Sequence, residues 1–161
     1  MTVYQALRYR FSRKNIMSLS ALVYRSRATL DIDAESLGAA RNDLTGEYYF
    51  PTPEHDRKFP REAFIASEFW IGNIASVAEL REELRTITTE HESTLLSRCL
   101  YSGSHSGDII ELTLLPALEQ EVRSFLDDRE MSLSRHLTSA LRGILGLIDT
   151  AKREGNPIVF V

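Results

Sequence analysis

Hydrophobic and polar residues alternate through residues 19–32, and this period of two predicts a strand with one buried side and one solvent-facing side. Leu22 and Leu30 fall on the buried side. Arg25 and Arg27 fall on the other side, where their charges stay in water. We therefore expect this segment to belong to a sheet that is covered on one face only.

Two more segments have the composition of strands. Residues 48–50 are aromatic and end at Pro51, which limits a strand because proline has no backbone N–H to donate. Residues 63–71 are rich in Phe, Ile and Trp and end at the turn signal Gly72–Asn73. Residues 95–101 fit either a strand or a short helix, and the pattern leaves both open.

The first helix is predicted to begin at Ser76. Ser76 and Glu79 form the S-x-x-E pattern of a capping box, in which each side chain satisfies a backbone N–H at the helix start. Apolar residues then recur at spacings of three and four, as on the buried side of an amphipathic helix. These residues are Val77, Leu80, Leu84 and Ile87.

Two further helices are predicted in the last third of the chain. One runs from near Thr113 to Asp127–Asp128, with Pro116 in its first turn, where the missing N–H is tolerated. The other is the longest, and either Ser132 or Ser134 caps its start.

Glycines mark the long helix and its end. Gly143 and Gly146 each cost about 1 kcal/mol relative to alanine in a helix, which indicates either close backbone packing or plain tolerance. Gly155 followed by Pro157 is a typical helix stop. The wholly apolar residues 158–161 then predict a buried strand inserted into the sheet.

The order of these elements predicts an α+β fold. Strands come first, helices follow, and one strand ends the chain, which favours a mainly antiparallel sheet with about three helices packed on one face and the C-terminal strand inserted in the sheet. Residues 17–161 are expected to form a single domain. Residues 1–16 are expected to be a basic N-terminal arm, because they hold four basic residues and no acid.

Charge separates the arm from the rest. The whole chain has 19 basic and 23 acidic residues, a formal net charge of −4, so residues 17–161 have 15 minus 23, or −8. A body with this charge repels phosphate backbones and attracts a basic protein, so we expect a protein partner and no nucleic acid. The candidate partner-binding residues are Asp31, Asp33, Glu35, Glu82, Glu83 and Asp108.

Reactive groups are few. Cys99 is the only cysteine, so the chain can form neither an internal disulfide nor a cysteine-based zinc site. The four histidines lack metal-ligand spacing, and no nucleotide-binding or nucleophile motif is present. We therefore expect no catalytic residue, no metal ligand and no cofactor.

The chain has no apolar run of the roughly 18 residues that a membrane span needs, and its start lacks the apolar core of a secretory signal. A cytoplasmic protein without membrane contact is expected.

Two alternatives to a binding protein stay open. One is a small enzyme with an unrecognised site near His105, Asp108 and Cys99. The other is an oligomeric adaptor domain that engages a partner through the basic arm.

Two segments carry a resemblance to a known group of proteins. The first is the strand end Trp70–Ile74 with the helix start Ser76–Arg81, and the second is Leu145–Lys152 closing on Glu154–Phe160. Together they resemble small immunity proteins of bacterial polymorphic-toxin and contact-dependent growth inhibition systems. The similarity covers residues 68–161.

The resemblance implies a function. An immunity protein of this kind binds the cognate toxin domain delivered by a neighbouring cell, often a nuclease, and neutralises it in the cytoplasm. It would need no cofactor and no catalytic residue, and would be a monomer or a homodimer. The acidic body fits this role, since nuclease domains present basic, phosphate-binding surfaces that an acidic inhibitor can approach quickly.

Overall fold

A four-stranded antiparallel sheet forms the centre of the computed structural model, which describes residues 18–52, 54, 59–129 and 132–161. The strand order is β4-β1-β6-β5. The strands are β1 (Ser18–Tyr24), β4 (Ile65–Asn73), β5 (Ile109–Ile110) and β6 (Ile158–Phe160). The C-terminal strand β6 lies between β1 and β5, so the predicted α+β fold with an inserted last strand is confirmed. The predicted N-terminal arm, residues 1–16, lies outside the described residues.

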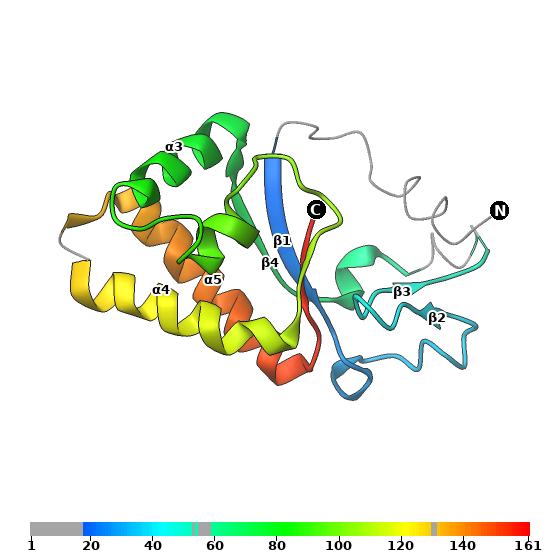
Figure 1. Cartoon of the computed structure of the whole chain (residues 1–161). Coiled ribbons are helices and arrows are strands. Elements are labelled where there is room, and N and C mark those ends of the chain that lie inside the picture. Colours follow the sequence, from blue (N-terminus) through cyan, green and yellow to red (C-terminus); the bar gives the residue numbers. More distant parts are fainter. Residues whose placement is uncertain (1–17, 53, 55–58, 130–131) are drawn as a thin grey trace.

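Three α-helices cover one face of this sheet within the described part of the chain (Figure 1). They are α3 (Ile74–Arg85), α4 (Leu115–Arg129) and α5 (Arg135–Glu154). Helix α5 is buried along its apolar side, where Leu141 and Ile144 join a core that also contains Leu19 and Ala21 of β1. Burial of each such side chain contributes roughly 1.5–3 kcal/mol before conformational entropy is counted.

A second, smaller cluster covers the opposite face. Its floor is made by Leu22 and Tyr24 of β1, and its cover comes from the segment between β1 and β4. That segment contains the short hairpin of β2 (Ala40–Arg41) and β3 (Tyr48–Tyr49). Tyr48 stacks on Phe64 with ring centroids 5.8 Å apart. Both faces of the sheet are therefore covered, which differs from the predicted one-sided burial.

The strand predicted for residues 19–32 is also too long. Strand β1 ends at Tyr24, and a 3-10 turn follows at Arg27–Thr29. Local and long-range hydrogen bonds hold this turn. The Thr29 N–H donates to the Ser26 carbonyl at 3.2 Å, and the Glu154 carboxylate accepts from the Ser26 N–H, at 2.9 Å, and from the Thr29 hydroxyl. The strand therefore ends here although the alternation of residue types continues.

The helix boundaries follow the predictions in most cases. Helix α4 has Pro116 in its first turn, and α5 is capped by Ser134, whose Oγ accepts from the Leu137 N–H at 3.0 Å. Gly155 ends α5 with a positive φ of 65°. Helix α3 is the exception.

Helix α3 begins two residues before Ser76. Asn73 is its N-cap, and its side-chain oxygen accepts from the Ser76 N–H at 2.8 Å, so the predicted Ser76–Glu79 capping box is wrong. Asn is as good an N-cap as Ser. The sequence analysis identified Asn73 only as part of the turn signal Gly72–Asn73, and this residue is where the helix starts. The undecided residues 95–101 contain a π-helical turn at Leu95–Cys99.

In the described part of the chain, no helix combines the length and the apolar character that crossing a membrane requires.

The two glycines of α5 give a matched test of its packing. A Cβ on Gly143 would lie 2.2 Å from Cζ of Phe69, whereas a Cβ on Gly146 would meet nothing within 4 Å. We expect Gly146→Ala to raise the free energy of unfolding by about 0.5–1 kcal/mol through helix propensity. Gly143→Ala should lower it by about 1–3 kcal/mol, because the Phe69 ring must move.

Urea unfolding of both variants measures these changes. A Phe69→Leu background supplies the control, since the shorter side chain should remove most of the Gly143→Ala loss. Equal effects of the two alanines in the wild-type background would contradict the contact between Phe69 and α5.

Candidate functional site

Three of the six candidate acids lie together in a cleft on the hairpin side of the sheet. Asp31, Asp33 and Glu35 follow the 3-10 turn and are exposed. They line a cleft of about 290 Å³ together with five other residues of the same lobe. These are Arg27, Leu30, Ile32, Ala34 and Tyr48. We refer to it as the acidic cleft.

Backbone and side-chain hydrogen bonds fix the shape of this segment. The Asp33 carboxylate accepts from the Ser36 N–H at 3.2 Å, and the Ser36 hydroxyl donates to the Asp33 carbonyl at 2.9 Å. Ala34 is buried, and its carbonyl accepts from the Ala39 N–H at 2.9 Å. The acids thus project from a turn that is anchored in the core through Ala34.

The acidic cleft keeps an excess of negative charge. Arg27 pairs with Glu35 at 2.6 Å, at side-chain exposures of 70% and 47%, so this ion pair contributes little to stability. Asp31 has no hydrogen-bond or ion-pair partner among the described residues. Three carboxylates against one guanidinium leave two net negative charges in the cleft.

The anchor of this region is a residue that the sequence analysis missed. Glu154 is 7% exposed at the last turn of α5, and its carboxylate binds the backbone where β1 ends. Burial opposes ionisation, but hydrogen bonds from Ser26 and Thr29 outweigh it and lower the pKa of Glu154. The position of Glu154 in the sequence could have indicated this role. A carboxylate is unfavourable at the C-terminus of a helix unless other groups bind it.

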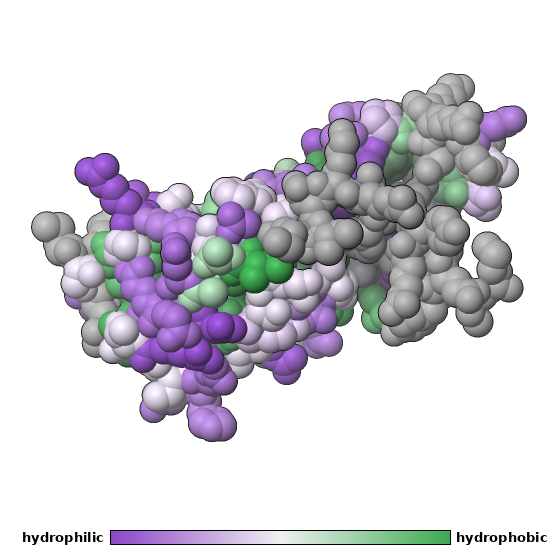
Figure 2. All heavy atoms as spheres, turned by 90° about the horizontal axis from the view of Figure 1, so that it is seen from above, coloured by the Kyte–Doolittle hydropathy of each residue, from purple (hydrophilic) through white to green (hydrophobic). Residues whose placement is uncertain are grey.

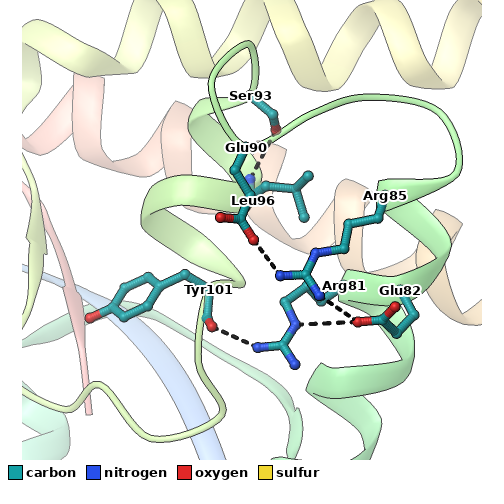
Figure 3. A network of polar contacts seen from close by, with 7 residues as sticks. All are labelled: Arg81, Glu82, Arg85, Glu90, Ser93, Leu96 and Tyr101. Atoms are coloured by element: carbon teal, nitrogen blue, oxygen red, sulfur yellow. Dashed lines mark hydrogen bonds and ion pairs between the residues drawn. The ribbon is translucent and has the colours of Figure 1, made fainter.

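Glu82 and Glu83 lie elsewhere, on α3, which packs on the other face of the sheet. Figure 3 shows Glu82 in contact with Arg85, at 2.6 Å, and with Arg81, at 3.8 Å. Arg85 also pairs with Glu90, and this hydrogen bond lowers the pKa of Glu90. Glu82 therefore belongs to an internal ion-pair network on the helical side.

Glu83 has a structural role. Its carboxylate accepts from both the Ser134 N–H, at 2.7 Å, and the Ser134 hydroxyl, at 2.6 Å. Ser134 is the N-cap of α5, so Glu83 joins α3 to the start of the longest helix. The six candidate acids consequently do not form one surface, and the acidic cleft is the place where three of them meet.

Asp108 lies beside the residues of the alternative enzyme hypothesis. His105 is 6% exposed, and its Nε2 lies 3.0 Å from the Cys99 carbonyl oxygen. Its Nδ1 lies 3.5 Å from the Asp108 carboxylate, which also accepts a hydrogen bond from the Tyr101 hydroxyl. The rings of Tyr101 and Phe160 pack against His105, with centroids 4.5 Å and 4.3 Å away. The Cys99 carbonyl, the His105 ring and the exposed Asp108 carboxylate therefore lie together.

The Cys99 thiol of this cluster is not available as a nucleophile. Cys99 is 1% exposed, and burial raises the pKa of its thiol far above the ordinary value, so it stays protonated and enclosed. His105 contacts the Cys99 backbone rather than supplying a base to the sulfur. Because a carbonyl only accepts, Nε2 carries the ring proton, and burial lowers the pKa of His105.

Tyr101 completes this cluster. Burial, together with the hydrogen bond to Asp108, raises the pKa of Tyr101 to about 12, so its hydroxyl stays protonated and donates to the carboxylate.

Within the residues that the structure describes, no three His, Cys, Asp or Glu side chains gather where they could hold a metal ion.

On the face seen in Figure 2, hydrophilic residues are numerous over the helical end of the molecule, and a hydrophobic patch lies beside them near the middle. Comparison with known proteins found no matching family model, no matching curated protein and no matching solved structure.

The buried His105 predicts a specific pH dependence. The unfolded chain binds a proton at His105 near pH 6.5, whereas the folded protein binds it only at lower pH. The stability that the neutral ring contributes is therefore complete above about pH 6.5 and is lost as the pH falls below it. The slope of unfolding free energy against pH gains up to about 1.4 kcal/mol per pH unit from this group.

We expect His105→Gln to flatten this slope between pH 6.5 and 5, as measured by urea unfolding. Glu154 and Glu90, whose pKa values are lowered, titrate below this pH range in the folded protein. Parallel curves for the wild type and the variant would show that His105 does not resist protonation.

Proposed function

We propose that this protein binds a cognate bacterial toxin domain and neutralises it in the cytoplasm, as immunity proteins do. The acidic cleft carries the proposal, because it gathers Asp31, Asp33 and Glu35 on an anchored turn and leaves two net negative charges exposed. A basic, phosphate-binding surface on a toxin is the complement of such a cleft. Occupation of that surface would exclude the nucleic acid that a nuclease toxin cleaves.

Electrostatics supports fast capture. The chain has a formal net charge of −4, and a field of one sign raises the association rate with an oppositely charged partner. Rapid binding suits a protein that must intercept a toxin before the toxin reaches its substrate.

An exposed tryptophan adds aromatic surface. Trp70 is 57% exposed and pairs with Ser20 across β4 and β1, so its side chain projects from the sheet face opposite the helices. The acidic cleft is built on the same face, since its residues belong to the cluster that covers Leu22. Tryptophan is enriched among the residues that dominate binding energy in protein interfaces.

The chemistry of the buried groups also supports binding over catalysis. Cys99 is enclosed with a raised pKa, and the buried His105 ring is held by Tyr101 and by the Cys99 carbonyl. Neither the thiol nor the imidazole is accessible to a substrate, whereas the candidate acids are exposed on the surface.

Co-expression provides the direct test. The candidate toxin is the C-terminal domain of the product of the open reading frame immediately upstream, expressed in a bacterial host with and without this protein. We expect the host to survive only when this protein is present, and to die when a toxin domain of another type replaces the upstream one. Death of cells that contain both the upstream toxin and soluble, folded protein would contradict the proposal.

Binding kinetics provide the physical readout. We expect a complex of nanomolar affinity whose association rate falls at least tenfold between roughly 0.05 and 0.5 M salt, because salt screens the steering field. The dissociation rate should change much less. An association rate independent of salt would remove the electrostatic part of the proposal.

A further inference from the structure

Strand β4 forms one edge of the sheet, and among the described residues it pairs with β1 alone. It is nine residues long, whereas β5 at the opposite edge has two residues. Sheet edges are commonly protected by lysine, proline or strong twisting. Strand β4 contains no lysine or proline, and Glu68 is its single charged residue. Between two register shifts, residues 67–70 pair with β1 without interruption, so this regular stretch can accept a further strand.

The pairing on the other side of β1 shows which way its backbone groups point. Ser20 exchanges two hydrogen bonds with Val161, because its N–H donates at 3.1 Å and its carbonyl accepts at 2.9 Å. Val161 directly follows β6, so Ser20 faces β6. Neighbouring residues of a strand point their backbone groups to opposite sides. Ala21 therefore faces β4, where its partner is Phe69.

Two residues of β4 face the open edge. Phe69 faces β1, so Glu68 and Trp70, on either side of it, direct their N–H and carbonyl groups away from β1. No residue in the described part of the chain forms a hydrogen bond with these backbone groups. Glu68 is exposed and Trp70 is 57% exposed, so another chain can approach them. The edge thus presents a short ladder of unpaired donors and acceptors.

This ladder is complementary to itself. If an antiparallel copy is centred on Phe69, Glu68 of each chain lies opposite Trp70 of the other. Each such pair exchanges two hydrogen bonds, which satisfies all the unpaired groups of both residues. The two Phe69 side chains then face each other across the symmetry axis, and aromatic cross-strand pairs stabilise a sheet. The pattern of the edge therefore fits a second copy of the same chain.

Electrostatics selects the same register. A carboxylate only accepts hydrogen bonds and the indole N–H only donates, so Glu68 of one copy and Trp70 of the other are complementary neighbours. A register that set Glu68 opposite Glu68 would place like charges together, which destabilises a strand pair. Pairing centred on Phe69 avoids this repulsion.

Other occupants fit the edge less well. A basic toxin strand would meet one carboxylate along the nine residues of β4. Strand β5 of a second copy is too short to cover β4, since it has two residues. Pairing of β4 with β4 about a two-fold axis covers both long edges at once, and such a contact closes without further copies.

We propose that two copies of this chain associate through β4, paired antiparallel about Phe69, to form one continuous sheet. A two-fold axis perpendicular to the sheet keeps both helical faces on one side and both hairpin faces on the other. On the helical side, α5 has glycine at position 143, beside Phe69, and at position 146, where a Cβ would meet nothing within 4 Å. Neither position obstructs an approaching copy. The dimer leaves both acidic clefts accessible, so it does not depend on the proposed function.

The mass of the whole protein in solution provides the first test. Light scattering after size-exclusion chromatography should give twice the chain mass of 18.3 kDa at high concentration, and a lower mass on dilution. In the dimer, the amide protons of Glu68 and Trp70 should exchange slowly with solvent, because they are paired with the second copy.

A proline at the open edge removes one donor of the proposed ladder. The Glu68 N–H points away from β1, so Glu68→Pro should preserve the pairing within the chain and weaken dimerisation at least tenfold. Glu68→Gln is the matched control, since it removes the charge but keeps the N–H, and it should change the dimer dissociation constant by less than threefold. Thermal melting shows whether the proline variant is folded.

A second pair of variants tests the register without touching the backbone. Trp70 is exposed, so Trp70→Lys and Trp70→Glu should both fold and both lose the indole. Opposite Glu68 of the second copy, lysine is attracted and glutamate is repelled, so the lysine variant should dimerise at least tenfold more tightly. Leu112 is exposed next to β5, at the other edge of the sheet, and Leu112→Lys and Leu112→Glu should differ by less than twofold.

Three results would overturn the inference. One is a single-chain mass for the wild type at all concentrations, whether the edge amides exchange quickly or are protected by another part of the chain. Another is a dimer that folded Glu68→Pro leaves unchanged. The last is equal dimerisation of Trp70→Lys and Trp70→Glu, which decides the matter even if the proline variant does not fold.

Discussion

Burial of β1 on both of its faces is the constraint on which the rest of the structure depends. Leu19 and Ala21 point into the helical core, while Leu22 and Tyr24 point into the hairpin-side cluster. The strand also pairs with β4 on one side and β6 on the other. A slip of one residue would exchange the two sets of side chains, so the register of β1 fixes both layers at once.

The same strand positions the acidic cleft. Where β1 ends, Glu154 at the last turn of α5 binds the Ser26 N–H and the Thr29 hydroxyl, and the chain leaves the sheet at that point. The following turn carries Asp31, Asp33 and Glu35 over the second cluster. A contact between residues 128 positions apart thus helps to hold the turn from which the exposed acids follow. The site is a consequence of the core rather than an addition to its surface.

The sequence predicted what local patterns control. Helix α5 follows from its apolar periodicity, its serine cap and Gly155, and β6 follows from its wholly apolar run. The end of β1 could not be predicted, because alternation continues past Ser26 and the turn that follows is held partly by the distant Glu154 carboxylate. The division of the six acids was equally hidden. Glu83 and Asp31 are both acidic residues in polar segments, yet Glu83 accepts hydrogen bonds from the N-cap of a helix 51 residues away and Asp31 has no partner among the described residues.

The cluster around Cys99 and the acidic cleft differ in whether their functional groups are accessible. Cys99, His105 and Asp108 are close together, but the thiol is enclosed and protonated, and the ring nitrogen that bears the proton is used by a backbone carbonyl. The acidic cleft has the opposite character, since its three carboxylates are exposed to solvent. A partner protein can reach them without any rearrangement of the core, whereas it cannot reach the Cys99 thiol. Accessibility therefore favours the acidic cleft over the buried thiol as a binding surface.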